Sequence, residues 1–127
     1  MKTPSEYSQQ AALVKRCQLE NIFIHSIENS LHFPIPNWFP PIVKKYIITM
    51  LAKLVKQRIN NGMVKGTPDL LVPEFKLYIE MKKEGGVVSK EQIAVHEILI
   101  LLGYDVRVFY SAKDAWGYIE KKRKEIK

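Results

Sequence analysis

The sequence predicts an α/β protein in which helices cover a mixed β-sheet. Segments whose apolar residues recur at helical spacing alternate with short apolar runs that are typical of strands. The resulting order of helix, strand, helix, two strands, helix, strand and helix indicates one sheet with helices packed against it. The 127 residues, 46% of them apolar, suffice for a single hydrophobic core, so we expect one domain over residues 1–127.

The chain begins with a helix over about residues 4–19 and a strand over residues 21–25. Thr3 can cap the helix, Pro4 suits its first position, and Glu6 would complete a capping box with Thr3. The apolar run within residues 21–25 is short enough for a strand. We therefore expect the first strand of the sheet directly after the helix.

A proline-rich loop and a long basic helix follow. Residues 34–41 contain four prolines, which lack an amide donor and break regular structure. From about residue 42 to 59 the apolar residues again follow helical spacing, with four lysines and an arginine between them. The helix ends at Asn60-Asn61-Gly62. This extra helix could contact DNA phosphates, form a dimer interface, or pack on the sheet with its lysines in solvent.

The second half of the chain contains two strands, a helix, a strand and a final helix. A turn around Pro73 separates the two strands. Ser89 and Gln92 form a second capping box at the start of the next helix, which ends at Gly103. In chain order these elements span about residues 69–72, 76–82, 89–102, 104–110 and 111–124.

The balance of charge predicts a polyanionic partner. The chain has 20 Lys and Arg against 13 Asp and Glu, a formal net charge of +7, which attracts nucleic acid or acidic membrane. No apolar run reaches the roughly 20 residues that span a bilayer, and the N-terminus lacks a signal-peptide core. The only cysteine, Cys17, fits a small buried helix residue in a reducing compartment. We expect a cytoplasmic protein without membrane contact.

Three charged residues in the second half, Asp69, Glu80 and Lys82, are the candidate catalytic group. Glu80 and Lys82 point to one face of their strand because strand side chains alternate, and pairing of residues 69–72 with 76–82 would bring Asp69 close to Glu80. Two such carboxylates repel unless a cation lies between them, and Mg²⁺ or Mn²⁺ prefers oxygen ligands. Lys82 would then hold or help to deprotonate a water. The alternative is a solvated, charged face of an amphipathic strand.

The order of these motifs resembles a known nuclease family. Glu80 lies eleven positions after Asp69, and a Gly-Gly turn and a helix that opens with Ser89-x-x-Gln92 follow. This series resembles the PD-(D/E)XK nuclease superfamily and, within it, the VRR-NUC (virus-type replication-repair nuclease) family. The resemblance covers residues 62 to about 119, with matching stretches at residues 62–71, 77–83, 85–92 and 102–106.

This resemblance implies a restriction-endonuclease-like fold and a metal-dependent DNA endonuclease. Hydrolysis of phosphodiester bonds by the superfamily implies 5′-phosphate and 3′-hydroxyl products. Small stand-alone relatives resemble homodimeric enzymes that act on branched DNA such as Holliday junctions or flaps in DNA repair, and a short chain needs a second copy to cut two strands symmetrically. The resemblance also allows a viral or phage source.

The resemblance also assigns roles to residues outside the core motif. Glu6 would be the acidic residue of the N-terminal helix, Gln92 would act from the helix after the motif, and the metal ligands would be Asp69, Glu80 and the backbone carbonyl of Met81. Capping alone explains Glu6 and Gln92 equally well. His96, one turn beyond Gln92, could face the same cleft, although a lone histidine on a helix is more often packed or exposed.

Two other functions remain open at this stage. A catalytically inactive DNA-binding module of the same fold would account for the basic charge, and a restriction-like or RNA-processing nuclease would use the same site. The resemblance says little about residues 26–61, where Glu28 and Asn29 stand in the reverse of the family order. Trp38 and Phe39 in this segment could stack on an unpaired base, bury in a partner subunit or anchor a core.

Overall fold

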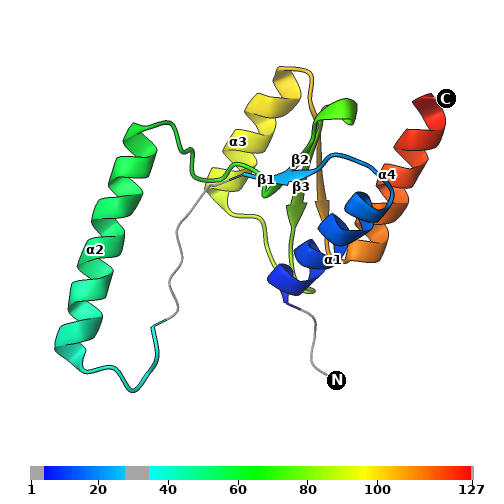
Figure 1. The fold of residues 1–127 in the computed structure, drawn as a ribbon. Helices are drawn as coiled ribbons and strands as arrows, with labels where there is room; N and C mark the ends of the chain where they lie inside the picture. The colour runs from blue at the N-terminus through cyan, green and yellow to red at the C-terminus, as the bar shows by residue number, and fades with distance from the viewer. Residues whose placement is uncertain (1–4, 28–34, 127) are drawn as a thin grey trace. The chain divides into compact units, whose positions relative to one another are not determined.

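The structure is a computed structural model that describes residues 5–27 and 35–126. Its helices and strands follow one another in the predicted order, which confirms the α/β class (Figure 1). In chain order the elements are α1 (Glu6–Leu19), β1 (His25–Ser26), α2 (Pro41–Asn60), β2 (Leu70–Val72), the 3₁₀ turn η1 (Pro73–Phe75), β3 (Leu77–Met81), α3 (Lys90–Leu101), β4 (Asp105–Phe109) and α4 (Ala112–Ile126).

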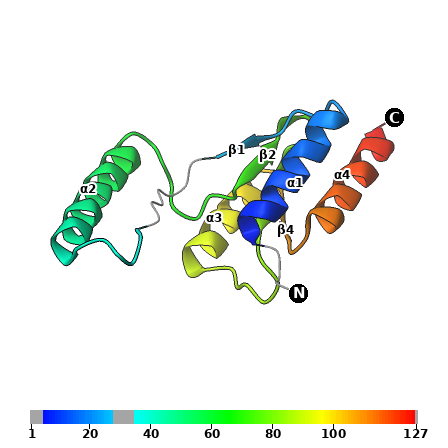
Figure 2. The ribbon, with the colours of Figure 1, turned by 60° about the horizontal axis from the view of Figure 1, so that its bottom comes forward.

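The four strands form one mixed sheet in the order β1-β2-β3-β4. The pairs β1·β2 and β2·β3 are antiparallel, whereas β3 and β4 are parallel. The parallel pairing is possible because α3 returns the chain from the end of β3 to the edge of the sheet at which β3 begins. The sheet lies between α3 on one side and the neighbouring helices α1 and α4 on the other (Figures 1 and 2). The predicted mixed sheet flanked by helices is therefore present.

Contacts divide the chain into two compact units. The first contains residues up to 27 and from 66 onward, and includes the sheet with α1, α3 and α4. The second spans residues 28–65 and contains α2, none of whose residues is buried. Two contact units can belong to one folding domain, so the expectation of a single domain stays a prediction.

The core lies on the face of the sheet that α1 and α4 cover. Strand alternation turns the apolar residues of β3 to this side, and residues four positions apart on each helix meet them. Cys17 is fully buried there, as predicted, and burial raises the pKa of its thiol to about 11. The cluster comprises Leu13, Cys17, Ile22, Ile24, Leu70, Val72, Leu77, Ile79, Met81, Ala115 and Ile119.

The N-terminal cap differs from the prediction. Ser5 is the N-cap of α1, and its hydroxyl accepts a hydrogen bond from the Ser8 N–H at 3.1 Å. Glu6 is therefore the first helical residue, and the predicted capping box between Thr3 and Glu6 is wrong. Ser5 can cap as well as Thr3 because both carry a β-hydroxyl, and Thr3 itself lies outside the described residues.

The first strand is shorter and later than predicted. β1 comprises only His25 and Ser26, which pair with Leu71 and Leu70, whereas the prediction was residues 21–25. Ile22 and Ile24 are buried in the core without belonging to a strand. The apolar pattern of Ile22 and Ile24 therefore indicates that their side chains are buried. How far β1 can pair is limited by β2, which has only three residues.

The remaining boundaries agree with the prediction to within a few residues. α2 begins at Pro41, whose ring suits the first helical position, and ends at Asn60 before the turn at Gly62. The capping box of α3 forms as expected, and the Ser111 hydroxyl caps α4 by accepting from the Asp114 N–H at 3.1 Å. Within the described residues, no helix is both long and apolar enough to cross a bilayer.

Candidate active site

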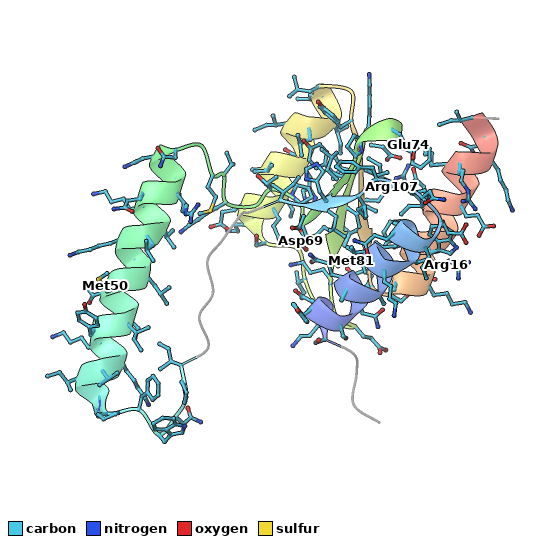
Figure 3. All side chains as sticks on the ribbon, in the orientation of Figure 1. Arg16, Met50, Asp69, Glu74, Met81 and Arg107 are labelled. Carbon is cyan, nitrogen blue, oxygen red and sulfur yellow. The ribbon has the colours of Figure 1, made fainter. Side chains whose placement is uncertain are left out.

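The pairing of β2 with β3 brings the two predicted carboxylates together. Leu70 pairs with Ile79, so continuing the antiparallel register by one residue places Asp69 opposite Glu80, on the same face of the sheet. The two side chains share a hydrogen bond. The Met81 N–H donates to Asp69 Oδ2 at 3.3 Å, and Asp69 and Met81 lie close together in Figure 3. This juxtaposition follows from the strand pattern that the sequence predicted.

Glu80 is a buried carboxyl group, only 2% exposed, on the face opposite the apolar core. Burial raises its pKa to about 9, and the hydrogen bond with Asp69 and the charges of Asp69 and Glu6 act in the same direction, while the charge of Lys82 lowers it. Its Oε1 atom has no hydrogen-bond partner among the described residues. A carboxyl group in this position gains from a nearby cation.

Lys82 supplies the positive charge closest in sequence to this pair. Its backbone N–H donates to the Phe109 carbonyl at 2.9 Å, so the sheet ladder continues to this residue. The half-buried side chain lowers the pKa of both Glu80 and His96 through its charge. Lys82 is therefore within electrostatic reach of both groups, of which strand alternation predicted only Glu80.

The start of α1 places Glu6 at the same end of β3. Its Oε1 accepts a hydrogen bond from the Lys83 N–H at 3.4 Å, across 77 positions of the chain, and its charge raises the pKa of Glu80. Glu6 thus lies near the predicted site and takes no part in a cap. The resemblance implied this neighbourhood, whereas no spacing in the sequence indicated it.

Gln92 has the capping role that the sequence predicted for it. Its Oε1 accepts from the Ser89 N–H at 2.8 Å, and its own N–H donates to the Ser89 hydroxyl at 3.2 Å. The side-chain oxygen of Gln92 is thereby committed to the cap. Only its side-chain NH₂ group remains for a further interaction.

His96 is a buried histidine beside Glu80. It lies on α3, is 8% exposed, and its Nε2 is 3.9 Å from Glu80 Oε1. In the described part of the chain, these two atoms are the buried side-chain polar atoms without a hydrogen-bond partner. Burial and the charge of Lys82 lower the pKa of the imidazole, while Asp69 raises it. The available signal was its position one helical turn after Gln92.

Gly66 lies in the turn before Asp69, close to the start of α3. Its φ is +90°, a backbone conformation that residues with a side chain rarely adopt. A Cβ atom there would lie 2.5 Å from the Glu91 carbonyl oxygen. The backbone of Glu91 therefore leaves no room for a side chain at this position. The sequence indicated a turn here but not this close approach.

The donor set fits Mg²⁺ or Mn²⁺. Asp69 and Glu80 offer hard oxygen ligands, one of them with an unpartnered buried atom, and Mg²⁺ is commonly held by one or two carboxylates while it keeps several waters. Among residues 5–27 and 35–126, no three His, Cys, Asp or Glu side chains are grouped to hold an ion. The Met81 backbone carbonyl that the resemblance implies would complete the set.

His25, Trp38 and Phe39, which the sequence also singled out, make aromatic contacts of their own. His25 is exposed and its ring contacts Phe23, with centroids 5.6 Å apart. Trp38 is 79% exposed and contacts Phe39 edge-on at 4.6 Å in the second unit, so it does not anchor a core. His32, Glu28 and Asn29 lie outside the described residues.

The chain matches no protein-family model, and it has no significant match among curated proteins or solved structures. Any statement about its function therefore depends on its own residues and their geometry. Within the sheet unit, those residues are Asp69, Glu80 and Lys82, with Glu6 and His96 beside them.

Proposed function

We propose that this protein is a metal-dependent DNA endonuclease with a PD-(D/E)XK, restriction-endonuclease-like fold of the VRR-NUC type. One observation carries the proposal: a buried glutamate with an unpartnered oxygen lies beside an aspartate and within electrostatic reach of a lysine. A buried carboxyl pair without a cation is costly, because in a poorly hydrated place two negative charges repel unless one group keeps its proton. A divalent ion bound between the two carboxylates would offset this cost.

In this mechanism Asp69, Glu80 and the Met81 carbonyl would hold Mg²⁺ or Mn²⁺. Such a cation, when bound, would lower the pKa of a water and neutralise charge on a phosphate oxygen. Lys82 orients the attacking water and stabilises the negative charge that develops around phosphorus in the transition state. Cleavage leaves a 5′-phosphate and a 3′-hydroxyl.

Two residues complete the proposed site. Glu6 adds a carboxylate at the end of β3, where it accepts the Lys83 N–H and leaves a second oxygen to orient water. Gln92 presents its side-chain NH₂ group, since its oxygen caps α3. Both are supporting groups, so their loss is expected to cost less activity than the loss of Asp69, Glu80 or Lys82.

We propose DNA as the substrate, and branched DNA such as Holliday junctions or flaps in particular. The net charge of +7 supports a polyanionic ligand. Symmetric cleavage of two strands at a junction requires two active sites, which a homodimer of this short chain would provide. Sedimentation of the protein alone and with a four-way junction tests the dimer.

The test of the proposed function compares isosteric and charge-removing variants on a substrate panel. Wild-type protein with Mg²⁺ or Mn²⁺ is expected to cut branched DNA faster than its linear arms or an RNA duplex. Glu80→Gln and Lys82→Ala are each expected to lower the cleavage rate by about 10²-fold or more, because each removes a charge that the transition state needs. Initial rates on end-labelled strands provide the measurement.

Matched controls are available next to both residues. Glu74→Gln changes an exposed acid on η1, and Lys83→Ala changes an exposed lysine next to Lys82, so both are expected to cut like wild type. Cleavage by Glu80→Gln at the wild-type rate would refute the hydrolase. If the wild-type protein binds junctions but leaves them intact with either metal, it is instead the inactive DNA-binding module. The basic charge alone would account for that function.

A further inference from the structure

His96 is a buried polar group that the proposed mechanism does not use. It is 8% exposed on α3, and its Nε2 faces Glu80 Oε1 across 3.9 Å. This distance exceeds that of a hydrogen bond, so both atoms are without a partner in the described part of the chain. The two atoms are complementary in the tautomer of His96 that carries its hydrogen on Nε2.

One oxygen of Glu80 lies toward His96. Glu80 interacts with Asp69, and its Oε1 has no hydrogen-bond partner among the described residues. Oε1 is the atom closest to the imidazole of His96. A cation held between Asp69 and Oε2 of Glu80 would leave Oε1 toward His96.

We propose that His96 is a positioning residue for Glu80: its Nε2–H donates a hydrogen bond to Oε1 and so fixes the carboxylate for metal binding through Oε2. A closure of about 1 Å from the present 3.9 Å brings the pair to hydrogen-bond distance. Carboxylates that bind metals are commonly oriented by such second partners. The inference rests on the proposed metal site and adds a residue that neither the sequence motif nor its resemblance assigns.

A direct metal ligand is the competing role for His96. Two atoms bound to one ion at about 2.1 Å each lie at most about 4.2 Å apart, so the distance from Nε2 to Oε1 alone permits it. Asp69, Glu80 and His96 do not, however, form a three-residue group suited to an ion within the described ranges. We therefore place one ion between Asp69 and Glu80, with His96 beside the carboxylate.

The experiment measures Mn²⁺ binding to the full chain by calorimetry, independently of cleavage. His96→Leu fills a similar volume without a donor, whereas His96→Gln retains an N–H donor. We expect His96→Leu to weaken Mn²⁺ binding by about 10- to 100-fold, the usual effect of losing such a partner, and His96→Gln to stay within a few-fold of wild type. Circular dichroism of the metal-free variants checks folding, and His96→Met replaces the leucine variant if that variant is misfolded.

The possible failures are distinguishable. Equal Mn²⁺ affinity of wild type and His96→Leu would overturn the positioning role while leaving the metal site intact. Coupling of bound Mn²⁺ to an imidazole ¹⁴N in pulsed electron paramagnetic resonance, lost in His96→Leu, would overturn it in favour of direct ligation. Absence of Mn²⁺ binding by the wild type would overturn the proposed function and this inference together. Glu80→Gln, which removes a ligand, is the control for loss of the site.

Discussion

Glu80 is chemically unlike a glutamate on the protein surface. Its environment raises its pKa to about 9, so without a metal it holds a proton at neutral pH and can donate that proton to Asp69. A cation beside the pair would favour the ionised form. Metal binding is therefore expected to release a proton and to stabilise the folded state.

The first prediction concerns the stability of the metal-free protein. The pKa of Glu80 is raised on folding, so its contribution is fully present below the unfolded pKa, near 4.5, and is lost as the pH rises toward about 9. We expect Glu80→Gln, which stays neutral, to be more stable than wild type at pH 8.5 by at least about 1.4 kcal/mol, the equivalent of one pKa unit. Urea denaturation in EDTA at pH 5 and pH 8.5 measures this.

The comparison with the variant is essential because His96 acts in the opposite direction. Its pKa is lowered, so its contribution grows as the pH rises through the ordinary range of histidine. Glu74→Gln removes an exposed acid and is the control for a change of net charge. An equal loss of stability with pH in wild type and Glu80→Gln would show that Glu80 titrates normally.

Residue-scale predictions from the sequence succeeded where strand geometry governed them. Asp69 and Glu80 meet because antiparallel pairing and strand alternation follow local rules. For Glu6 the sequence allowed a cap or a place at the site, and Ser5 forms the cap, because several adjacent residues can cap one helix. The contact between His96 and Glu80 joins two elements, and no local pattern encodes it.

At the scale of the elements, the turn before β2 lies close to the backbone at the start of α3. Gly66 combines a positive φ with a backbone neighbour at 2.5 Å, whereas Gly62 has a positive φ of +106° and open space around its Cβ position. A side chain at Gly62 would cause backbone strain alone, whereas one at Gly66 would cause backbone strain and a steric clash. Comparing the two positions therefore separates these effects. Asp69 follows Gly66 by three residues, so displacement of the turn would reach the carboxylate.

We predict that Gly66→Ala destabilises the protein more than Gly62→Ala does. Alanine at a positive φ costs about 1 kcal/mol at either position, and at Gly66 the backbone of Glu91 must also move, for a total above about 2 kcal/mol. Urea denaturation gives both values. Gly66→Ala is also expected to weaken Mn²⁺ binding, while Gly62→Ala leaves it unchanged. Equal costs for the two variants would mean that the turn relaxes freely.

The element boundaries show why the first strand was misplaced. The apolar residues Ile22 and Ile24 alternate as in a strand and are buried, yet β1 consists of His25 and Ser26. Periodicity measures which side chains turn inward, but hydrogen bonding to a neighbour defines a strand. The partner strand β2 has only three residues, which restricts the ladder.

At the scale of the whole molecule, the excess of positive charge belongs to both units. α2 carries Lys44, Lys45, Lys53 and Lys56, and none of its residues is buried. If these lysines contact DNA phosphates, binding releases counterions and becomes steeply dependent on salt. If α2 is instead a dimer interface, its charge has a weaker effect on that dependence.

We predict that replacing these four lysines of α2 by glutamine weakens binding to a four-way junction and flattens its salt dependence. Each lost phosphate contact should reduce the slope of log K against log salt by about 0.9. The slope is measured by fluorescence anisotropy at salt concentrations from roughly 50 to 200 mM, where counterion release dominates.

The control makes the same change of charge in the other unit. Lys15, Lys76, Lys90 and Lys113 are exposed, and their replacement by glutamine lowers the net charge equally. A smaller effect on the slope than that of the α2 variant supports a DNA contact through α2. An equal effect would mean that α2 contributes only net charge, and sedimentation of the α2 variant would then test the dimer interface.

The sequence by itself determined the kind and order of the elements and the face on which Glu80 and Lys82 lie. Helix caps, turns and strand alternation depend on neighbours a few positions apart, so their physics is visible in a linear pattern. Tertiary structure decided which faces meet: the approach of Glu6 to Lys83, the position of His96 beside Glu80, and the contact of Gly66 with α3. These contacts join residues that are distant in the chain, and their energies depend on three-dimensional packing that periodicity does not specify.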